Sequence, residues 1–214
     1  MRTEPAWATE SAERSLAQQR VRGVERAQHI VAASRRLVVR RGADFTVQEL
    51  AREARIALPT FYRHFPSKDL VLVAVIDDMI RERCDELRVR VQGVSDPLDR
   101  LRLHVEGALM SDSSSAGWAP SVVASEHYRL LRLYPEQMTR AMTAFTDLLV
   151  PEIEAAAVLG RLTNPEPAHA AWFVTQLLVG VFHRAHFGDD ATPELLGDRL
   201  WRFVCSGLGA PVRA

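Results

Sequence analysis

Four side chains that donate hydrogen bonds stand almost in a row in the first third of the chain: Thr60, Tyr62, Arg63 and His64. Phe61 and Phe65 lie four residues apart, so they can share one apolar face of a short helix and leave the donors on its other sides. Pro59 suits the first turn of such a helix, because the early backbone N–H groups have no intrahelical partner. A helix of this kind is typical of proteins that read the major groove of DNA.

A second short helix is predicted immediately before it. The spacing T-x-x-E from Thr46 to Glu49 favours a capping box, in which the hydroxyl and the carboxylate each accept from a free backbone N–H. We expect this helix to run to about Ala54 and the chain to turn at 55–57. The donor-bearing helix then covers 58–65. Two short helices joined by a tight turn form a helix-turn-helix candidate.

These segments resemble a known family. T-V-Q-E-L-A-x-x-A, followed by P-T-F-Y-R-H-F-P-S-K, is similar to the amino-terminal signature of the TetR family of bacterial transcriptional regulators. Ile30 to Gly42 matches the first helix of that family, and the resemblance extends from Val24 to Asp69. It implies an all-α protein, with an N-terminal three-helix helix-turn-helix DNA-binding domain followed by a larger helical ligand-binding and dimerisation domain.

The resemblance also implies which residues contact DNA. Phosphates would be held by Thr46, Tyr62, His64 and Lys68, while Leu58, Pro59, Thr60 and Arg63 would face the groove. Two positions depart from the family pattern. Arg55 stands where glycine is usual, and a positive φ there costs a non-glycine residue about 1 kcal/mol. Ala57 stands where serine is frequent, and the missing helix cap costs on the order of 1 kcal/mol.

The charge of the chain is unevenly distributed. Its 27 basic and 27 acidic residues balance, but residues 21–70 hold ten Lys or Arg against five Asp or Glu. A basic segment of this kind suits a module that binds a polyanion, although a solvated helix face gives the same count. Lys68 is the single lysine of the chain, and the resemblance places a phosphate-contacting lysine at this position.

The composition is that of a globular protein. With 214 residues, 47% hydrophobic and 25% charged, the chain has room for one sizeable core or two small domains. No apolar run approaches the roughly 20 residues that span a bilayer, and no signal peptide is apparent, so we expect a cytoplasmic protein. The two cysteines are far apart in sequence and are expected to be reduced. No cofactor is predicted.

Three segments are expected along the chain. Residues 1–23 lack a sustained apolar period and are expected to form a disordered arm, whose arginines could follow phosphates. Residues 24–74 form the helix-turn-helix domain, whose first helix runs from about Val24 to Arg41 with one apolar stripe. Residues 75–214 form the helical effector-binding and dimerisation domain. The helix beginning near Lys68 belongs to both domains, which makes it a natural lever between them.

Large apolar or amphipathic side chains of the second domain are candidates for an effector pocket. They are His104, Met110, Trp118, Tyr128, Met138, Met142, Phe145, Trp172 and Phe173, and many such residues simply belong to a core. Few charges fall among them. The pattern favours a hydrophobic or aromatic ligand with one or two polar anchors such as His104 or His127.

The last two helices are candidates for a dimer interface. The segment 165–187 is apolar on most sides, and the final helix from about Pro193 has an apolar face. On the resemblance, both helices pair with their copies through Leu178, Val181, Phe182, Leu196, Leu200 and Phe203. A central core helix in a monomer would show the same pattern.

Other chemistry is weakly supported. His183 and His186 could be half of a metal site, but no further ligand follows at the required spacing. No nucleophile elbow, phosphate loop or HExxH motif is present, so an enzyme is not predicted.

The sequence therefore predicts a homodimeric transcriptional repressor that a small apolar or aromatic effector releases from a near-palindromic operator. One alternative is a helical ligand-binding or metal-binding protein that contacts nucleic acid only nonspecifically. A ligand-independent regulator or an activator is another.

Overall fold

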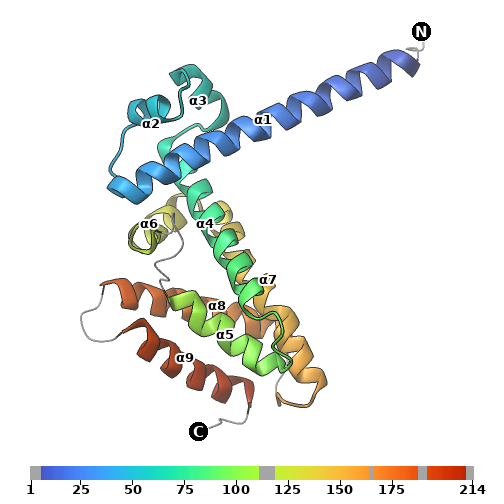
Figure 1. Cartoon of the computed structure of the whole chain (residues 1–214), viewed down its shortest axis with the longest axis vertical. Helices are drawn as coiled ribbons and strands as arrows, with labels where there is room; N and C mark the ends of the chain where they lie inside the picture. Colours follow the sequence, from blue (N-terminus) through green and yellow to red (C-terminus); the bar gives the residue numbers. More distant parts are fainter. Residues whose placement is uncertain (1–5, 111–118, 164–165, 188–191, 211–214) are drawn as a thin grey trace. The chain divides into compact units, whose positions relative to one another are not determined.

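The architecture is all-α. The computed structural model describes residues 6–110, 119–163, 166–187 and 192–210, and within these ranges every regular element is a helix (Figure 1). The helices are α1 (Ala6–Arg41), α2 (Val47–Glu53), α3 (Leu58–His64), α4 (Lys68–Arg90), α5 (Pro97–Leu109), α6 (Pro120–Leu133), α7 (Pro135–Val158), α8 (Pro167–Phe187) and α9 (Pro193–Leu208). None of these helices combines the length and the apolar character that crossing a bilayer requires.

Helix α1 begins much earlier than the sequence pattern indicated. The chain is helical from Ala6, where we expected an irregular arm up to residue 23 and a helix start near Val24. The added turns are rich in Ala, Glu, Gln and Arg, which are strong helix formers. Every residue from Glu13 to Arg22 is exposed, so these turns have no apolar stripe to reveal the helix in the sequence. Residues 1–5 lie outside the described ranges.

The chain divides into two compact units, residues 1–75 and 76–214, and the division falls within helix α4. In unit 1, α1 packs against α2 and α3. The predicted stripe of α1 is confirmed, because Ile30, Ala33, Ser34, Leu37 and Val38 are all buried. Phe45, Leu50 and Phe61 complete this small core. Helix α1 ends at Arg41, and the following residue, Gly42, adopts the positive φ of 67° that a C-terminal glycine permits.

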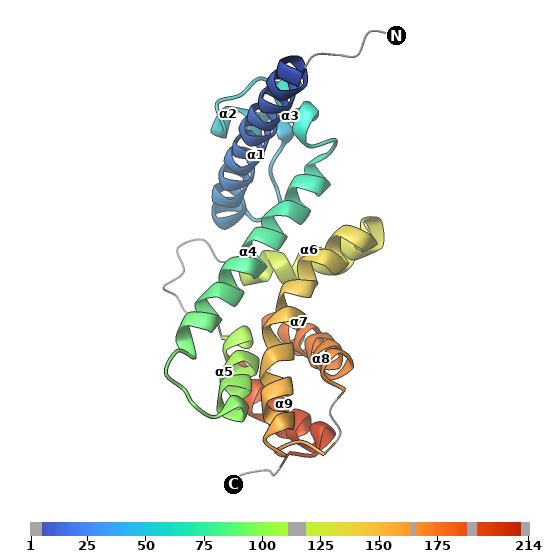
Figure 2. The ribbon, with the colours of Figure 1, turned by 90° about the vertical axis from the view of Figure 1, so that its right-hand side faces the viewer.

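In unit 2, α7 packs against α5, α6 and α8, while α9 packs against α5 and α8. Helices α5, α8 and α9 lie side by side in Figure 1, and the turned view of Figure 2 shows α7 running along α5. Leu101, Leu130 and Met138 are among its largest fully buried side chains. Each of these five helices begins with a proline, and Asp96 caps α5 by accepting a hydrogen bond from the backbone N–H of Leu98 at 2.9 Å.

Candidate nucleic-acid interface and effector pocket

Helix α3 is held to unit 1 by its apolar face. Phe61 is fully buried and stacks on Phe65 with ring centroids 6.2 Å apart. None of the eight residues predicted to contact DNA is buried: Thr46, Pro59, Tyr62 and Arg63 are exposed, and Leu58, Thr60, His64 and Lys68 are partly exposed. Tyr62 has 54% of its surface exposed. The donors of α3 are therefore accessible to a large ligand while the helix is anchored by a phenylalanine.

The capping box of α2 is present as predicted. The backbone N–H of Glu49 donates to the Thr46 hydroxyl at 3.2 Å, and the backbone N–H of Thr46 donates to the Glu49 carboxylate at 2.7 Å. Arg41 donates to the same carboxylate at 2.6 Å. The hydrogen bond from the Thr46 backbone, followed by that from Arg41, lowers the pKa of Glu49 to about 2. The carboxylate is thus ionised, as the positive end of a helix favours.

The turn between α2 and α3 carries the two departures noted in the sequence. Arg55 has a φ of 51°, and it is the sole non-glycine residue with a positive φ in the described ranges. Ala57 occupies the N-cap of α3 and has no side chain with which to accept a hydrogen bond from the helix. The turn therefore forms without a glycine to avoid the strained φ and without a serine to cap α3.

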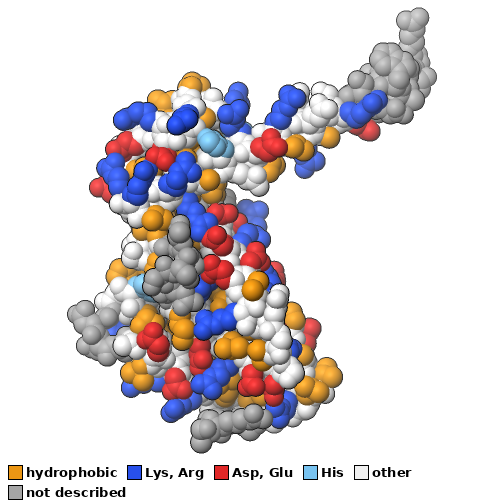
Figure 3. Space-filling view, in the orientation of Figure 1, with side chains coloured by type: hydrophobic (Ala, Val, Ile, Leu, Met, Phe, Trp, Pro, Cys, Tyr) orange, Lys and Arg blue, Asp and Glu red, His pale blue; other side chains and the backbone are white. Residues whose placement is uncertain are grey.

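Helix α1 holds α2 in place through side-chain hydrogen bonds that the sequence pattern did not indicate. His29 donates from Nε2 to the backbone carbonyl of Ala54, at the end of α2, over 2.8 Å. Arg36 and Arg40 both donate to Glu53, at 2.8 and 2.6 Å. Figure 3 shows Lys and Arg side chains gathered on unit 1 with acidic side chains among them. Part of the basic surplus of this unit is thus engaged in holding α2.

Lys68 is the first residue of α4. Its Nζ lies 4.8 Å from the centroid of the Phe45 ring, a distance at which a cation is attracted to the face of an aromatic ring. Ser67 caps the helix by accepting a hydrogen bond from the backbone N–H of Leu70 at 3.2 Å. The ammonium group therefore sits beside the small core of unit 1, at the N-terminal end of a helix.

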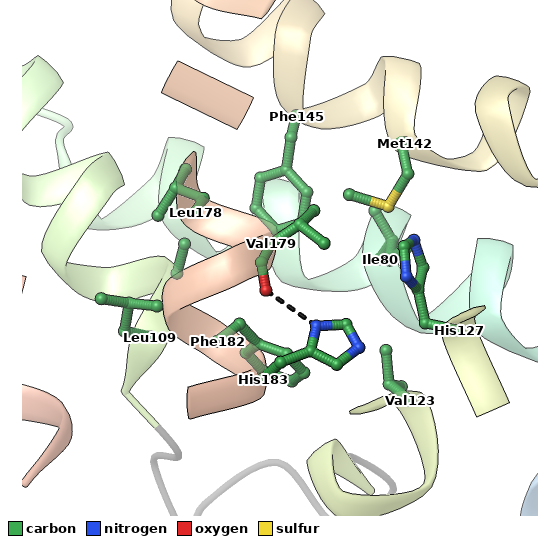
Figure 4. Close-up of a pocket in the computed structure, with 11 residues that line it drawn as sticks. Ile80, Leu109, Val123, His127, Met142, Phe145, Leu178, Val179, Phe182 and His183 are labelled. Carbon is green, nitrogen blue, oxygen red and sulfur yellow. Dashed lines mark hydrogen bonds between the residues drawn. The ribbon is translucent and has the colours of Figure 1, made fainter. Parts of the chain in front are cut away.

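Unit 2 contains an apolar pocket between α4, α5, α6, α7 and α8. Its enclosed volume is about 40 Å³, or about 460 Å³ when the space out to solvent is counted. Of the predicted effector residues, Met142 and Phe145 line it, and so does His127, one of the two predicted polar anchors. Figure 4 shows two imidazoles at its border, those of His127 from α6 and His183 from α8. Among the described residues, no Lys, Arg, Asp or Glu side chain lines the pocket.

The other effector candidates lie elsewhere. His104 and Met138 are buried, and His104 lies 3.8 Å from the Glu152 carboxylate, so both belong to the core of unit 2. Tyr128 is exposed and does not line the pocket, but its ring packs against that of His183, with centroids 4.3 Å apart. Met110 ends α5, where its carbonyl accepts a hydrogen bond from Arg83 at 2.7 Å. Trp118 lies outside the described residues.

Trp172 and Phe173 are exposed on α8, so neither enters the pocket. Phe173 instead lines a groove of about 450 Å³ between α8 and α9, together with Leu177 and Phe203. We call this the α8/α9 groove. Phe173 and Phe203 are 60% and 63% exposed, which is unusual for side chains of this size.

The six residues predicted for a dimer interface fall into three groups. Phe203 is exposed in the α8/α9 groove, and Val181 and Leu196 are half-buried. Leu178 and Leu200 are buried within unit 2, and Leu178 and Phe182 line the apolar pocket. The sequence did not single out Leu177, although its spacing of four from Phe173 places both on one face of α8.

The histidine pair on α8 does not form a metal centre within the described residues. His183 and His186 each use Nδ1 to donate to a backbone carbonyl one turn earlier, at 2.8 Å. No group of three or more His, Cys, Asp or Glu side chains comes together in the described part of the chain. Cys84 is buried, and burial raises the pKa of its thiol to about 12, which suppresses the reactive thiolate.

Comparison with known proteins gives one family. The family model described as "Bacterial regulatory proteins, tetR family" matches residues 30–75. The HTH-type transcriptional regulator EthR of Mycolicibacterium smegmatis is 35% identical over 86 residues, which are 39% of this chain and 40% of that regulator. The chain therefore spans less than half the length of this curated relative.

Solved structures share the fold over most of the chain. The fatty acid degradation regulator FadR from Bacillus halodurans is 16% identical, with a TM-score of 0.65 over 86% of this chain and 97% of that one. AibR, in complex with isovaleryl coenzyme A and operator DNA, is 18% identical, with a TM-score of 0.57 over 87% of this chain and 100% of that one. At these identities the likeness concerns the fold alone.

Proposed function

The chain belongs to the TetR family of bacterial regulatory proteins, and we propose on that basis that it is a transcriptional repressor that binds a near-palindromic DNA operator as a homodimer and leaves it on binding a small apolar effector. The observation that supports this proposal best is that helix α3 exposes its hydrogen-bond donors while its apolar face is anchored. Its donors Thr60, Tyr62 and Arg63 are accessible, while buried Phe61 fixes the helix in unit 1. A reading helix needs both properties, because imprecise placement loses base contacts.

The contact residues divide into two roles. Tyr62, His64 and Lys68, with Thr46 at the N-cap of α2, would bind phosphates, which fixes the position of α3 and gives salt-dependent affinity. Arg63 would donate to a guanine edge, and Leu58 or Pro59 would pack on a thymine methyl group. This division predicts different consequences for loss of the two kinds of contact.

The α8/α9 groove supports the homodimer. Its exposed phenylalanines form an apolar surface that a second copy of α8 and α9 would cover. The pocket lined by Met142 and Phe145 supports an apolar effector. For release, the effector must bind the form that has left DNA more tightly, by roughly 1 to 3 kcal/mol of coupling free energy.

Fluorescence anisotropy of a labelled duplex tests the proposal. The duplex comes from the region upstream of the gene, or from a random-library selection if that region is not bound, and random DNA is the competitor. We expect wild-type binding to survive the competitor. Arg63→Ala should weaken the free energy of binding to the specific duplex by about 1 to 3 kcal/mol, and the variant should no longer prefer this duplex over random DNA. Lys68→Ala should weaken binding to all sequences and reduce the salt slope by about 1.

Arg140→Ala is the charge-matched control, because Arg140 is an exposed residue of α7 in unit 2. It should bind DNA as the wild type does. If no selected sequence is bound better than random DNA, the protein does not read sequence. A helical ligand-binding protein with nonspecific nucleic-acid contacts would then be the better description.

A further inference from the structure

The apolar pocket of unit 2 contains a hydrogen-bond acceptor without a donor. Nδ1 of His183 lies 2.8 Å from the carbonyl oxygen of Val179. A carbonyl only accepts, so this nitrogen carries the proton. In a neutral imidazole the other nitrogen, Nε2, then presents a lone pair. This Nε2 is buried and has no hydrogen-bond partner. Figure 4 shows it on the side of the ring that faces away from Val179.

A second unpartnered nitrogen lies close by. His127 is 5% exposed, and its Nδ1 is buried without a hydrogen-bond partner. The rings of His127 and His183 have centroids 5.2 Å apart, at an interplanar angle of 56°. Burial, and secondarily the neighbouring His183, lowers the pKa of His127 to about 4. Near pH 7 this ring is therefore neutral, with one nitrogen donating and the other accepting.

The remaining lining of the pocket narrows the kind of ligand. It is apolar and includes Phe145, Phe182 and Met142, with no charged side chain from the described part of the chain. Burying an anion there would be costly, because none of the described lining residues is a Lys or Arg that could pair with it. A ligand that offers only an acceptor, such as an ester or thioester carbonyl, would leave Nε2 of His183 without a donor. The site therefore suits a neutral group that donates and accepts at once.

We propose that this pocket binds an uncharged phenol, whose hydroxyl group donates to Nε2 of His183 and accepts from Nδ1–H of His127. The inference names the chemistry of the effector and so rests on the proposed function. One hydroxyl satisfies both buried nitrogens, and the aromatic ring packs among Phe145, Phe182 and Met142.

The size of the pocket limits the phenol to a single ring. An enclosed volume of about 40 Å³ holds about one water molecule. Met142 lines the pocket, is partly exposed, and is an unbranched side chain that adopts new rotamers readily. Its movement would make room for one ring within the space of about 460 Å³ that extends out to solvent. Multi-ring and long-chain molecules should bind more weakly.

Isothermal titration calorimetry of the full chain at pH 7.5, without DNA, tests the assignment. The probes are 4-methylphenol, its methyl ether 4-methylanisole, which cannot donate, and benzoate, which is an anion. We expect 4-methylphenol to bind about tenfold or more tightly than the ether, because the ether leaves Nε2 unpaired. Benzoate should bind more weakly still. Equal affinities of phenol and ether, a preference for benzoate, or no binding of the phenol would each overturn the assignment.

Matched variants locate the effect. His183→Phe should reduce the preference of phenol over ether to about twofold or less. His186→Phe should retain the wild-type preference, because His186 makes the same kind of backbone hydrogen bond on α8 but does not line the pocket. Circular dichroism checks that each variant is folded.

If His183→Phe does not fold, nitrogen-15 NMR of the wild-type histidines replaces it. The Nε2 resonance of His183 should then move on addition of 4-methylphenol and not on addition of the ether. An unchanged resonance with bound phenol would contradict the proposed hydrogen bond. Since no DNA is present in these experiments, their failure is distinguishable from a failure of operator binding.

Discussion

Two buried imidazoles, His104 and His127, give the protein a dependence on pH that its surface residues would not. Burial lowers the pKa of each to about 4, with positive side chains nearby contributing at His104. The folded protein therefore keeps both rings neutral at pH values where an unfolded chain, with an ordinary histidine pKa near 6.5, binds protons. Both histidines therefore affect the pH dependence of stability, independently of any contact with an effector.

We predict that the free energy of unfolding falls as the pH is lowered from about 6.5 to about 4. In this window the unfolded state binds more protons than the folded state, so acid favours unfolding, by up to about 1.4 kcal/mol per pH unit for each histidine. Urea denaturation at pH 7, 6 and 5 measures the slope. His127→Phe should make it shallower, whereas His169→Gln, which removes an exposed imidazole, should keep it. A slope unchanged in His127→Phe would contradict the assignment.

At the scale of elements, the turn between α2 and α3 has a backbone conformation that its residue types do not favour. A positive φ crowds the Cβ of Arg55 against its own backbone, and Ala57 leaves a backbone N–H of α3 without a side-chain cap. The buried face of α3 and the bracing of α2 by His29 and Arg36 hold this turn in place. Tertiary contacts thus impose a conformation that the local sequence does not favour.

We predict that Arg55→Gly raises the free energy of unfolding by up to about 1 kcal/mol, because glycine adopts a positive φ without the Cβ conflict. Urea denaturation at constant pH measures the change. Arg52→Gly is the matched control: it removes the same charge from within α2, where glycine costs about 1 kcal/mol relative to a good helix former. Destabilisation by Arg55→Gly comparable to that by Arg52→Gly would show that the turn is unstrained.

Local signals predicted most of the helices. Thr46 with Glu49 marked the start of α2, Pro59 the start of α3 and Pro193 the start of α9, because caps and N-terminal prolines act within one turn. The early start of α1 was missed, since an exposed helix without an apolar stripe has only propensity to reveal it. The pocket was predicted only in part. Met142 and Phe145 could be named from their size and His127 as a polar anchor. His183 was not named as a pocket residue, because it lines the pocket only through the packing of α8 beside α6.

At the scale of the whole molecule, the exposed apolar side chains of α8 and α9 bear on oligomeric state. Phe173, Leu177 and Phe203 would remain in contact with water in an isolated chain. The sequence could not separate these residues from Leu178 and Leu200, because an apolar helix that is buried on two sides looks the same against its own core and against a partner. The exposed fractions distinguish the two sets, because Leu178 and Leu200 are buried whereas Phe173 and Phe203 are exposed. We therefore expect the contact surface to include the α8/α9 groove.

We predict that Phe203→Glu prevents the proposed dimer from forming, since a carboxylate would have to be buried in the apolar contact without a partner. Sedimentation equilibrium measures the oligomeric state, and operator affinity should fall with it because one protomer reads only one half-site. Val158→Glu is the control, as Val158 is an apolar residue 86% exposed at the end of α7, outside the groove. A dimeric Phe203→Glu protein would place the contact on another surface.

The single lysine of the chain gives the protein a built-in chemical reporter. An amine-selective reagent has one side-chain target, Lys68, and its Nζ lies beside the Phe45 ring. If this amine contacts a phosphate, bound DNA shields it from acylation. The degree of labelling at Lys68, read by mass spectrometry of the peptide that contains it, then reports operator occupancy without a fluorophore or a mutation. Conversely, acylation of this one residue would remove the charge that the phosphate requires.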